Sequence, residues 1–553
     1  MKTKQHFGDY SDRELKSMRS EQLIEIIMNV QNDDNFIIMT DSYKMTHHLL
    51  YPEGLREVFS YMEPRGGDMP YTVFFALQYY LKRYVAGKRI TQAKINEAHK
   101  KNILHFGFDC FDSTMWDHIL KVHDGELPLE IKAVPEGTPV AVKNVIMTIR
   151  NTDSKCAALT NITETLLMKL WAPNTVAAYA RIMKELITRY HSQTSCLPEF
   201  LIDFNHHDFG YRGVNSEESA RILGAAGLTS FKGTDTMGAL SFCDKYYDEP
   251  MAGFSVIASE HSVMCSYGGR DKEAGAYKSI IDKVKKVCAN VNPSSGIIIL
   301  SLVSDTYNIY NVCHKILPEL ASEFIGWTNN NGIAIKIVVR PDSGEAEDVL
   351  FGVKEFDQNQ ESLELVERVK SDMNISFEEA HGLVKKGVFN ILFDKFGSTV
   401  NDKGYRVLNP QIGVLQGDGV SLTSSKVLFK RMVIEKIDTM MLVLGSGGKY
   451  LQAHDRDEQK YAIKATHIIT EDGPVNIEKN PITDPGKKSK HGYLKLVRVG
   501  EGYNGFKTLQ SGDPGFDEGE DCLVTVFLNG KITKEYTFAE IRENCKISVL
   551  ELA

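Results

Sequence analysis

The sequence predicts an α/β fold made of parallel β/α units, and two observations lead to this prediction. First, short apolar runs recur through the middle of the chain with helical stretches between them, at 296–303, 333–339, 412–415 and 440–444. Such alternation is typical of parallel strands joined by helices. Second, each run is followed by polar residues or glycines, and α/β proteins bind ligands beyond the carboxyl ends of their strands. We therefore expect a ligand site at these ends.

Composition and charge exclude several classes of protein. The 553 residues are 42% hydrophobic and 25% charged, which indicates a folded chain of roughly two to four domains. The net charge of −9 gives no positive field for a phosphate backbone, so we expect no nucleic-acid partner. The N-terminus lacks the apolar core of a signal peptide and no apolar run is long enough to span a bilayer. We therefore expect a cytoplasmic protein with no membrane partner. The nine cysteines are scattered without a Cys-x-x-Cys pair, which indicates neither a disulfide framework nor a zinc site.

Outside the middle of the chain the patterns are less regular. Residues 12–30 have apolar positions at helical spacing, and we interpret the apolar run at 36–39 as a buried strand. A long helix is expected at 157–192. Four further strands are expected, at 129–134, 140–149, 493–499 and 523–528.

These patterns predict the domain organisation. We expect an N-terminal extension over residues 1–35, an α/β domain formed by 36–180 together with 457–553, and a β/α domain over 181–456. The charged stretch 345–404 has helical pieces but no evident active-site chemistry, and we expect it to be a surface insertion in the β/α domain.

Two glycine-containing loops follow predicted strands. Gly447 and Gly448 lie in a Gly-Ser-Gly-Gly segment, whose backbone N–H groups have no Cβ in the way of phosphate oxygens. Gly417 and Asp418 lie in a second loop of this kind. For any one loop, ordinary turn chemistry is the plainer interpretation. However, polar or glycine-rich residues follow four predicted strands, including the one that precedes Asp305. This repetition favours a shared binding site.

Arg340 and Asp342 flank a proline, which fixes the backbone between them. An arginine suits bidentate contacts with phosphate, and an aspartate accepts hydrogen bonds from sugar hydroxyls. The alternative interpretation is an internal salt bridge at a strand end.

The segment 207–213 has an unusual density of functional side chains. Phe209 is suited to stack on a flat ring and Arg212 to bind an anion. Asp235 follows a predicted strand end, and Glu260 stands beside His261. A lone histidine is more often structural than catalytic, so these residues alone do not assign a role to His261.

Taken in order, these motifs closely resemble the nicotinamide phosphoribosyltransferases. The resemblance covers residue 36 to the C-terminus and rests on nine segments, at 40–44, 129–137, 207–214, 231–236, 260–262, 303–305, 337–344, 416–419 and 445–448. It implies an irregular β/α barrel of the type II phosphoribosyltransferases with a second α/β domain formed by the N- and C-terminal segments. The implied enzyme is a homodimer whose active sites are shared between subunits.

The resemblance also implies a reaction. Nicotinamide would react with 5-phosphoribosyl 1-pyrophosphate to give nicotinamide mononucleotide and pyrophosphate in NAD salvage, with ATP as a co-substrate whose hydrolysis is coupled through a phosphohistidine. Mg²⁺ is the implied metal, held largely by phosphates and water and not by a protein-only site. His261 matches the phosphorylated histidine, with Asp305 as its acidic partner and Glu260 beside it.

The resemblance also implies which residues of this sequence contact the substrates. The pyridine ring would lie between Phe209 and Tyr43 of the partner subunit, with Asp235 accepting a hydrogen bond from the carboxamide. Arg340 and Asp41 complete the nicotinamide site. The phosphoribosyl group would contact Arg212, Asp342, Gly417, Asp418, Gly447 and Gly448. The pyrophosphate and ATP phosphates would contact Arg65, Arg456, Lys464 and Lys487.

Two alternatives stay open at this point. A nicotinate phosphoribosyltransferase would share the fold, although an ionised Asp235 suits an amide and repels a carboxylate. A catalytically silent nicotinamide-binding homologue would share the binding residues. Ala462, where the family usually has a serine, and Lys449, in place of a third glycine, are the departures closest to the phosphates.

Overall fold

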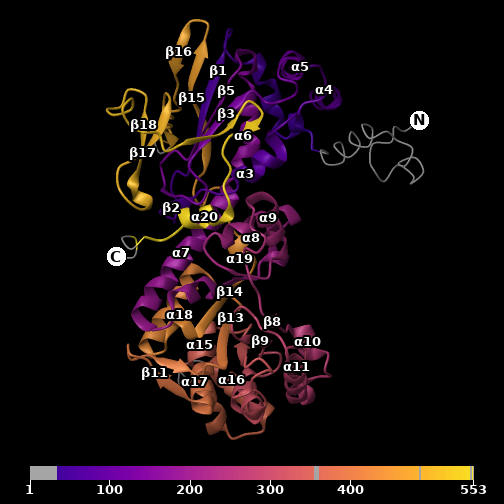
Figure 1. Ribbon diagram of the computed structural model, residues 1–553, viewed down its shortest axis with the longest axis vertical. Coiled ribbons are helices and arrows are strands. Elements are labelled where there is room, and N and C mark those ends of the chain that lie inside the picture. The colour runs from indigo at the N-terminus through magenta and orange to yellow at the C-terminus, as the bar shows by residue number, and fades with distance from the viewer. Residues whose placement is uncertain (1–33, 354–359, 485–486, 549–550, 552–553) are drawn as a thin grey trace, which may run out of the picture. The chain divides into compact units, whose positions relative to one another are not determined.

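The computed structural model describes residues 34–353, 360–484, 487–548 and 551 (Figure 1). The helix expected at 12–30 lies outside the described residues, as does almost all of the expected extension. The chain forms two compact units, each described here by itself. Unit 1 consists of Met1–Asn174 and Arg456–Tyr536, and unit 2 of Thr175–Asp455 and Thr537–Ala553.

Unit 1 is built on a seven-stranded antiparallel sheet. In spatial order its strands are β16 (Gly473–Asn476), β15 (Ala462–Thr470), β1 (Glu57–Glu63), β5 (Met147–Asn151), β3 (Leu129–Ala133), β19 (Val524–Leu528) and β20 (Lys531–Ile532). Two strand pairs accompany it: β2 (Tyr71–Val73) with β4 (Pro139–Ala141), and β17 (Leu494–Arg498) with β18 (Phe506–Gln510). The main helices are α3 (Leu77–Tyr80), α4 (Gln92–Phe106), α5 (Ser113–Val122) and α6 (Leu159–Met168). Tyr61, Met62 and Ile131 are fully buried in the core of this unit.

Several sequence predictions need correction in this region. Residues 36–39 are not a strand, because the Asn35 side chain accepts a hydrogen bond from the Ile37 amide and starts a single 3₁₀ turn at Phe36–Ile38. The strand expected at 140–149 is two strands, β4 and β5. The helix expected at 157–192 is also divided, into α6 and α7 (Trp171–Thr194).

Unit 2 contains a seven-stranded sheet in which all neighbouring strands are parallel. Their spatial order is β7 (Gly233–Thr234), β6 (His206–Asp208), β14 (Leu442–Ser446), β13 (Ile412–Gln416), β10 (Ile335–Arg340), β9 (Ile298–Val303) and β8 (Ile257–Ala258). Phe254, just before β8, forms a parallel bridge with Gly233 of β7. This bridge joins β7 to the segment that leads into β8, so the sheet closes irregularly on itself and the predicted fold class is confirmed.

Helices surround this barrel, as Figure 1 shows for α15 to α18 around β9, β13 and β14. The helices of unit 2 are α7, α8 (Glu217–Leu228), α9 (Met237–Tyr247), α10 (His261–Cys265), α11 (Glu273–Val287), α12 (Ile309–Asn311), α13 (Leu317–Glu319), α14 (Ala321–Phe324), α15 (Ala346–Phe351), α16 (Gln360–Met373), α17 (Phe377–Phe396), α18 (Leu422–Ile434), α19 (Gly448–Leu451) and α20 (Phe538–Asn544). Among the described residues, none of the helices has the length and apolar character needed to cross a membrane.

The stretch 345–404 is partly buried and is not only a surface insertion. Phe389 and Leu392 of α17 are fully buried, and the Phe389 ring stacks on Phe351 of α15 with centroids 5.5 Å apart. The apolar positions of α17 therefore contribute to the core of unit 2.

The last described residues belong to unit 2, whereas the sequence analysis placed all of 457–553 in the first domain. The Thr537 side chain caps α20, and Arg542 Nε donates to the carbonyl of Leu228 at the end of α8, at 3.0 Å. Figure 1 shows this yellow helix beside α8. A guanidinium that completes the hydrogen bonds of a helix end is a tertiary contact that no sequence pattern reveals.

Candidate active site

The carboxyl ends of the seven parallel strands carry most of the residues that the sequence analysis selected in unit 2. Because neighbouring strands are parallel, these ends open toward one mouth of the barrel. In strand order from β7 to β8, the residues at or just after the ends are Asp235, Phe209, Gly447, Gly417, Arg340, Asp305 and Glu260 with His261.

Asp235 is held by two hydrogen-bond donors at this mouth. His207 Nε2 lies 3.0 Å from Asp235 Oδ1, and the Ser255 hydroxyl donates to the same oxygen. Burial acts to raise the pKa of Asp235, but the hydrogen bond and charge of His207, the Ser255 bond and the Arg340 charge together lower it below its usual value. Asp235 is therefore an ionised acceptor at neutral pH.

Phe209 is positioned by a glycine of the neighbouring strand. Its backbone amide donates to the carbonyl of Ser446 at 2.8 Å, and its ring centroid lies 4.9 Å from that of His207. The ring also covers Gly445, where an added Cβ would lie 2.1 Å from Phe209 Cε2. Only glycine at 445 leaves room for the ring in this position.

A hydrogen bond joins His261 and Asp305 between the ends of β8 and β9. His261 Nε2 is 3.2 Å from Asp305 Oδ1. The second carboxylate oxygen of Asp305 accepts from the amide of Asp342 at 3.1 Å and from the Ser343 hydroxyl. Asp305 is nearly buried, with 7% of its side chain exposed, whereas His261 is 48% exposed. The acid is thus fixed in place and the imidazole is accessible. Glu260 beside it accepts from the Ser262 hydroxyl.

Arg340 does not pair with Asp342. Its Nη2 donates to the carbonyl of Ser259 at 2.9 Å, and its buried Nε has no hydrogen-bond partner among the described residues. The internal salt bridge considered in the sequence analysis is therefore not formed. A buried N–H of this kind requires an acceptor, which a bound ligand or water would supply.

The glycine loops bring backbone very close to backbone. A Cβ added at Gly213 would lie 2.6 Å from the Cα of Gly448, so the two segments touch without side chains. A Cβ added at Gly447 would meet nothing within 4 Å, which leaves space beside that residue. At Gly417 an added Cβ would lie 2.9 Å from Asp342 Oδ1. Arg212 is exposed in the turn that contains Gly213, and Asp418 is an exposed residue of its loop.

The remaining selected residues lie in unit 1. Asp41 Oδ2 accepts from the Thr165 hydroxyl of α6 at 3.2 Å, and Tyr43 is 57% exposed. The buried Lys44 pairs with Glu164 at 3.1 Å, which anchors this segment to the same helix.

Arg65 and Lys464 lie in a crowded group of cations. Burial lowers the pKa of Lys464, and the charges of Arg65, Lys479 and Lys44 lower it further against the opposing charge of Glu164. Arg65 Nη2 is buried without a hydrogen-bond partner among the described residues, although its Nε pairs with Glu63 at 3.4 Å. Such a group favours an anionic ligand.

Arg456 and Lys487 are exposed. They pair with the nearby Asp457 and Asp484, at 3.4 and 3.0 Å respectively.

Three contributors to the site are not among the site residues predicted from the sequence. Ser255 and His207 hold Asp235, and Ser343 holds Asp305. Serine in a loop carries no sequence signal for such a contact. His207 begins the segment 207–213, which was selected for its functional side chains. Its contact with Asp235 follows from the pairing of β6 with β7.

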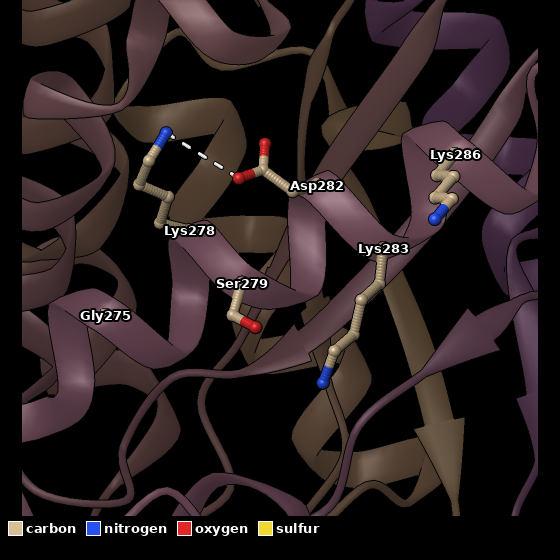
Figure 2. Close-up of a pocket in the computed structure, with 6 residues that line it drawn as sticks. All are labelled: Gly275, Lys278, Ser279, Asp282, Lys283 and Lys286. Carbon is tan, nitrogen blue, oxygen red and sulfur yellow. Dashed lines mark ion pairs between the residues drawn. The ribbon is translucent and has the colours of Figure 1, made fainter.

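A depression elsewhere on unit 2 contains none of these residues. It has a volume of about 390 Å³ and lies along the solvent-facing side of α11, lined by Gly275, Lys278, Ser279, Asp282, Lys283 and Lys286. Figure 2 shows the ion pair between Lys278 and Asp282 within it. We place the candidate active site at the strand ends because the buried, convergent polar groups are there.

Comparisons with known proteins identify the family of this chain. Residues 204–530 match the model of the nicotinate phosphoribosyltransferase (NAPRTase) family, and residues 35–131 match the N-terminal domain of nicotinamide phosphoribosyltransferase. A nicotinamide phosphoribosyltransferase of Xanthomonas campestris pv. campestris is 35% identical over 92% of this chain and 97% of its own length. One from Acinetobacter baylyi is 29% identical over 91% and 95%.

Solved structures with distant similarity were also found. Nicotinate-nucleotide pyrophosphorylase from Pyrococcus furiosus is 13% identical with a TM-score of 0.49, and covers 93% of this chain and 95% of its own. Human nicotinic acid phosphoribosyltransferase is 12% identical with a TM-score of 0.46, over 92% and 93%.

Proposed function

The chain belongs to the nicotinate phosphoribosyltransferase (NAPRTase) family and is a pentosyltransferase, and from this premise we propose its substrates and mechanism. The acceptor is nicotinamide and the donor is 5-phosphoribosyl 1-pyrophosphate, so that the products are nicotinamide mononucleotide and pyrophosphate in NAD salvage. The observation that carries the choice of acceptor is the ionised Asp235, held by His207 and Ser255 beside the Phe209 ring.

Asp235 selects for the amide. An ionised carboxylate accepts a hydrogen bond from a carboxamide NH₂ and repels the carboxylate of nicotinate. Phe209 would stack on one face of the pyridine ring, and Tyr43 of the partner subunit would cover the other face in a homodimer with shared sites. The exposure of Tyr43 is compatible with that contact.

The transfer needs no protein base, because the pyridine nitrogen carries its own lone pair. This pair forms the new bond to the anomeric carbon as the bond from that carbon to the pyrophosphate oxygen breaks, and the leaving group keeps the electron pair. Catalysis then consists of orienting both substrates and neutralising the leaving group. Arg340 and Asp342 would hold the ribose end, and the loops at Gly417 and Gly447 the 5′-phosphate.

Mg²⁺ fits this site as an ion held mainly by substrate oxygens and water. Both oxygens of Asp305 already accept hydrogen bonds, so this carboxylate is committed to His261 and Asp342. When bound, the ion would reduce the negative charge of the departing pyrophosphate. Arg65 and Lys464 of unit 1 are proposed to contact pyrophosphate or ATP phosphates, as are Arg456 and Lys487.

His261 is proposed to take the γ-phosphoryl group of ATP. The bond between this group and ADP breaks, ADP keeps the electron pair, and phosphorus bonds to the ring nitrogen of His261 that is not held by Asp305. The pairing supports the proposal because it fixes the ring orientation while the imidazole stays accessible. Hydrolysis of the phosphohistidine would favour product formation.

One assay tests the proposed function. Purified enzyme with 5-phosphoribosyl 1-pyrophosphate and Mg²⁺ is given nicotinamide or nicotinate, with and without ATP, and mononucleotide is measured. We expect product from nicotinamide, a much smaller kcat/KM with nicotinate, and stimulation by ATP. A preference for nicotinate would support the other substrate class, and nicotinamide binding without turnover would support a silent homologue.

A further inference from the structure

A group of metal-ligating side chains in unit 1 has no part in the proposed reaction. His118 of α5, His123 just after this helix and Asp153 after β5 lie together. Both histidine Nε2 atoms approach the same oxygen, Asp153 Oδ2, at 2.9 Å for His118 and 2.8 Å for His123. The three ligand atoms lie within 4.8 Å of one another.

The backbone around this group is fixed. Asp153 Oδ1 accepts from the amide of Lys155 at 2.8 Å, so only Oδ2 is turned toward the histidines. The amide of His123 donates to the carbonyl of Ile119 at 3.1 Å, which sets the end of α5. Support of this kind orients ligands before an ion binds. The side chains are 15 to 25% exposed, so the group is reachable from solvent.

A neighbouring pair shows what an ordinary histidine–aspartate contact looks like in this chain. His99 Nε2 meets Asp109 Oδ2 at 2.8 Å, with one histidine for one carboxylate and greater exposure. At Asp153, two imidazoles converge on one oxygen from separate positions of the chain. Ligands of a tetrahedral zinc ion at about 2.0–2.2 Å lie roughly 3.3–3.6 Å apart, so each imidazole would withdraw from Asp153 Oδ2 by only about 0.4–0.8 Å to admit an ion.

We propose that His118, His123 and Asp153 bind a divalent transition-metal ion of the zinc class. Two imidazoles and one carboxylate suit Zn²⁺, whereas Mg²⁺ prefers oxygen ligands, so this ion is distinct from the Mg²⁺ of the proposed reaction. Three protein ligands leave one position for water. The ion would tie the end of α5 to the segment after β5 and would stabilise unit 1 on binding.

The test is Zn²⁺ binding to the metal-free, untagged full chain, measured by competition with a chromophoric chelator. We expect His118→Gln and His123→Gln each to lower the affinity for one equivalent of Zn²⁺ by about tenfold or more. His99→Gln is the matched control and should bind as the wild type does. Loss of the same equivalent in the control, or no Zn²⁺ equivalent in the wild type, would overturn the proposal.

A second measurement separates ligation from misfolding. Co²⁺ in such a site gives visible absorption bands that depend on its ligands. We expect both variants to lose these bands while the far-UV circular dichroism of the metal-free chain and its turnover of nicotinamide stay at the wild-type level. Wild-type bands that persist in both variants would show that the ion binds elsewhere, and would refute the assignment.

Discussion

Replacing Gly445 by alanine would test whether β14 positions the ring of Phe209. The added Cβ would lie 2.1 Å from Phe209 Cε2, and ordinary contact begins at 3.4 Å, so the ring must withdraw by about 1.3 Å. A misplacement of about 1 Å can cost up to ~100-fold in rate, and a lost aromatic contact about 0.5–1.5 kcal/mol. We expect kcat/KM for nicotinamide to fall about 10- to 100-fold, or about 1.4–2.7 kcal/mol of transition-state stabilisation.

Steady-state kinetics with each substrate varied in turn would check this expectation. The KM for nicotinamide should rise, while the KM for 5-phosphoribosyl 1-pyrophosphate stays close to the wild-type value. Gly275→Ala is the matched control, since a Cβ there meets nothing within 4 Å. A folded Gly445→Ala enzyme with unchanged kcat/KM for nicotinamide would refute the argument that this glycine makes room for the ring.

Two further predictions concern the same site, and a third concerns the buried His206 of β6. Asp235→Asn should raise the kcat/KM of nicotinate relative to nicotinamide by about tenfold or more, because it removes a charge that repels the acid; an unchanged ratio would contradict the amide contact. His261→Ala should abolish ATP stimulation but keep basal turnover, measured as mononucleotide formed with and without ATP; full stimulation would exclude the phosphohistidine. Burial, with the charge of His207, lowers the pKa of His206 to about 3. In the unfolded chain this histidine has a pKa of about 6.5, so below that pH the unfolded chain binds a proton that the folded chain does not. The free energy of unfolding should therefore fall by up to about 1.4 kcal/mol per pH unit from about pH 6.5 toward pH 3. His206→Gln should flatten this dependence in urea unfolding, and equal slopes for both proteins would disprove it.

The parallel sheet was visible in the sequence because its longer strands are buried on both faces. The run at 412–415 became β13, in which every residue is buried, and the run at 296–303 became β9. Strands β7 and β8 have two residues each, too short for any periodicity to indicate. The run at 36–39 was misassigned because a side-chain cap can turn an apolar segment into a helix start.

The site could be predicted only as far as residue type and chain order carry information. Asp235 and Arg340 were identified because each follows a predicted strand, and Phe209 because of the density of functional side chains in 207–213. The donors that hold them were not, because contacts such as that of Ser255 with Asp235 depend on which strands close the barrel. The relation of His261 to Asp305 was expected from the resemblance, and the structure supplies the distance.

The seam of the barrel has a consequence for specificity. Two backbone hydrogen bonds hold it, from the Thr234 amide to the Phe254 carbonyl at 3.0 Å and from the Phe254 amide to the Lys232 carbonyl at 2.7 Å. Asp235 stands on one side of this join and Ser255 on the other. If Asp235 recognises the amide as proposed, that recognition depends on these two main-chain hydrogen bonds. A substitution that weakens them would then lower the selectivity for the amide even with every site residue intact.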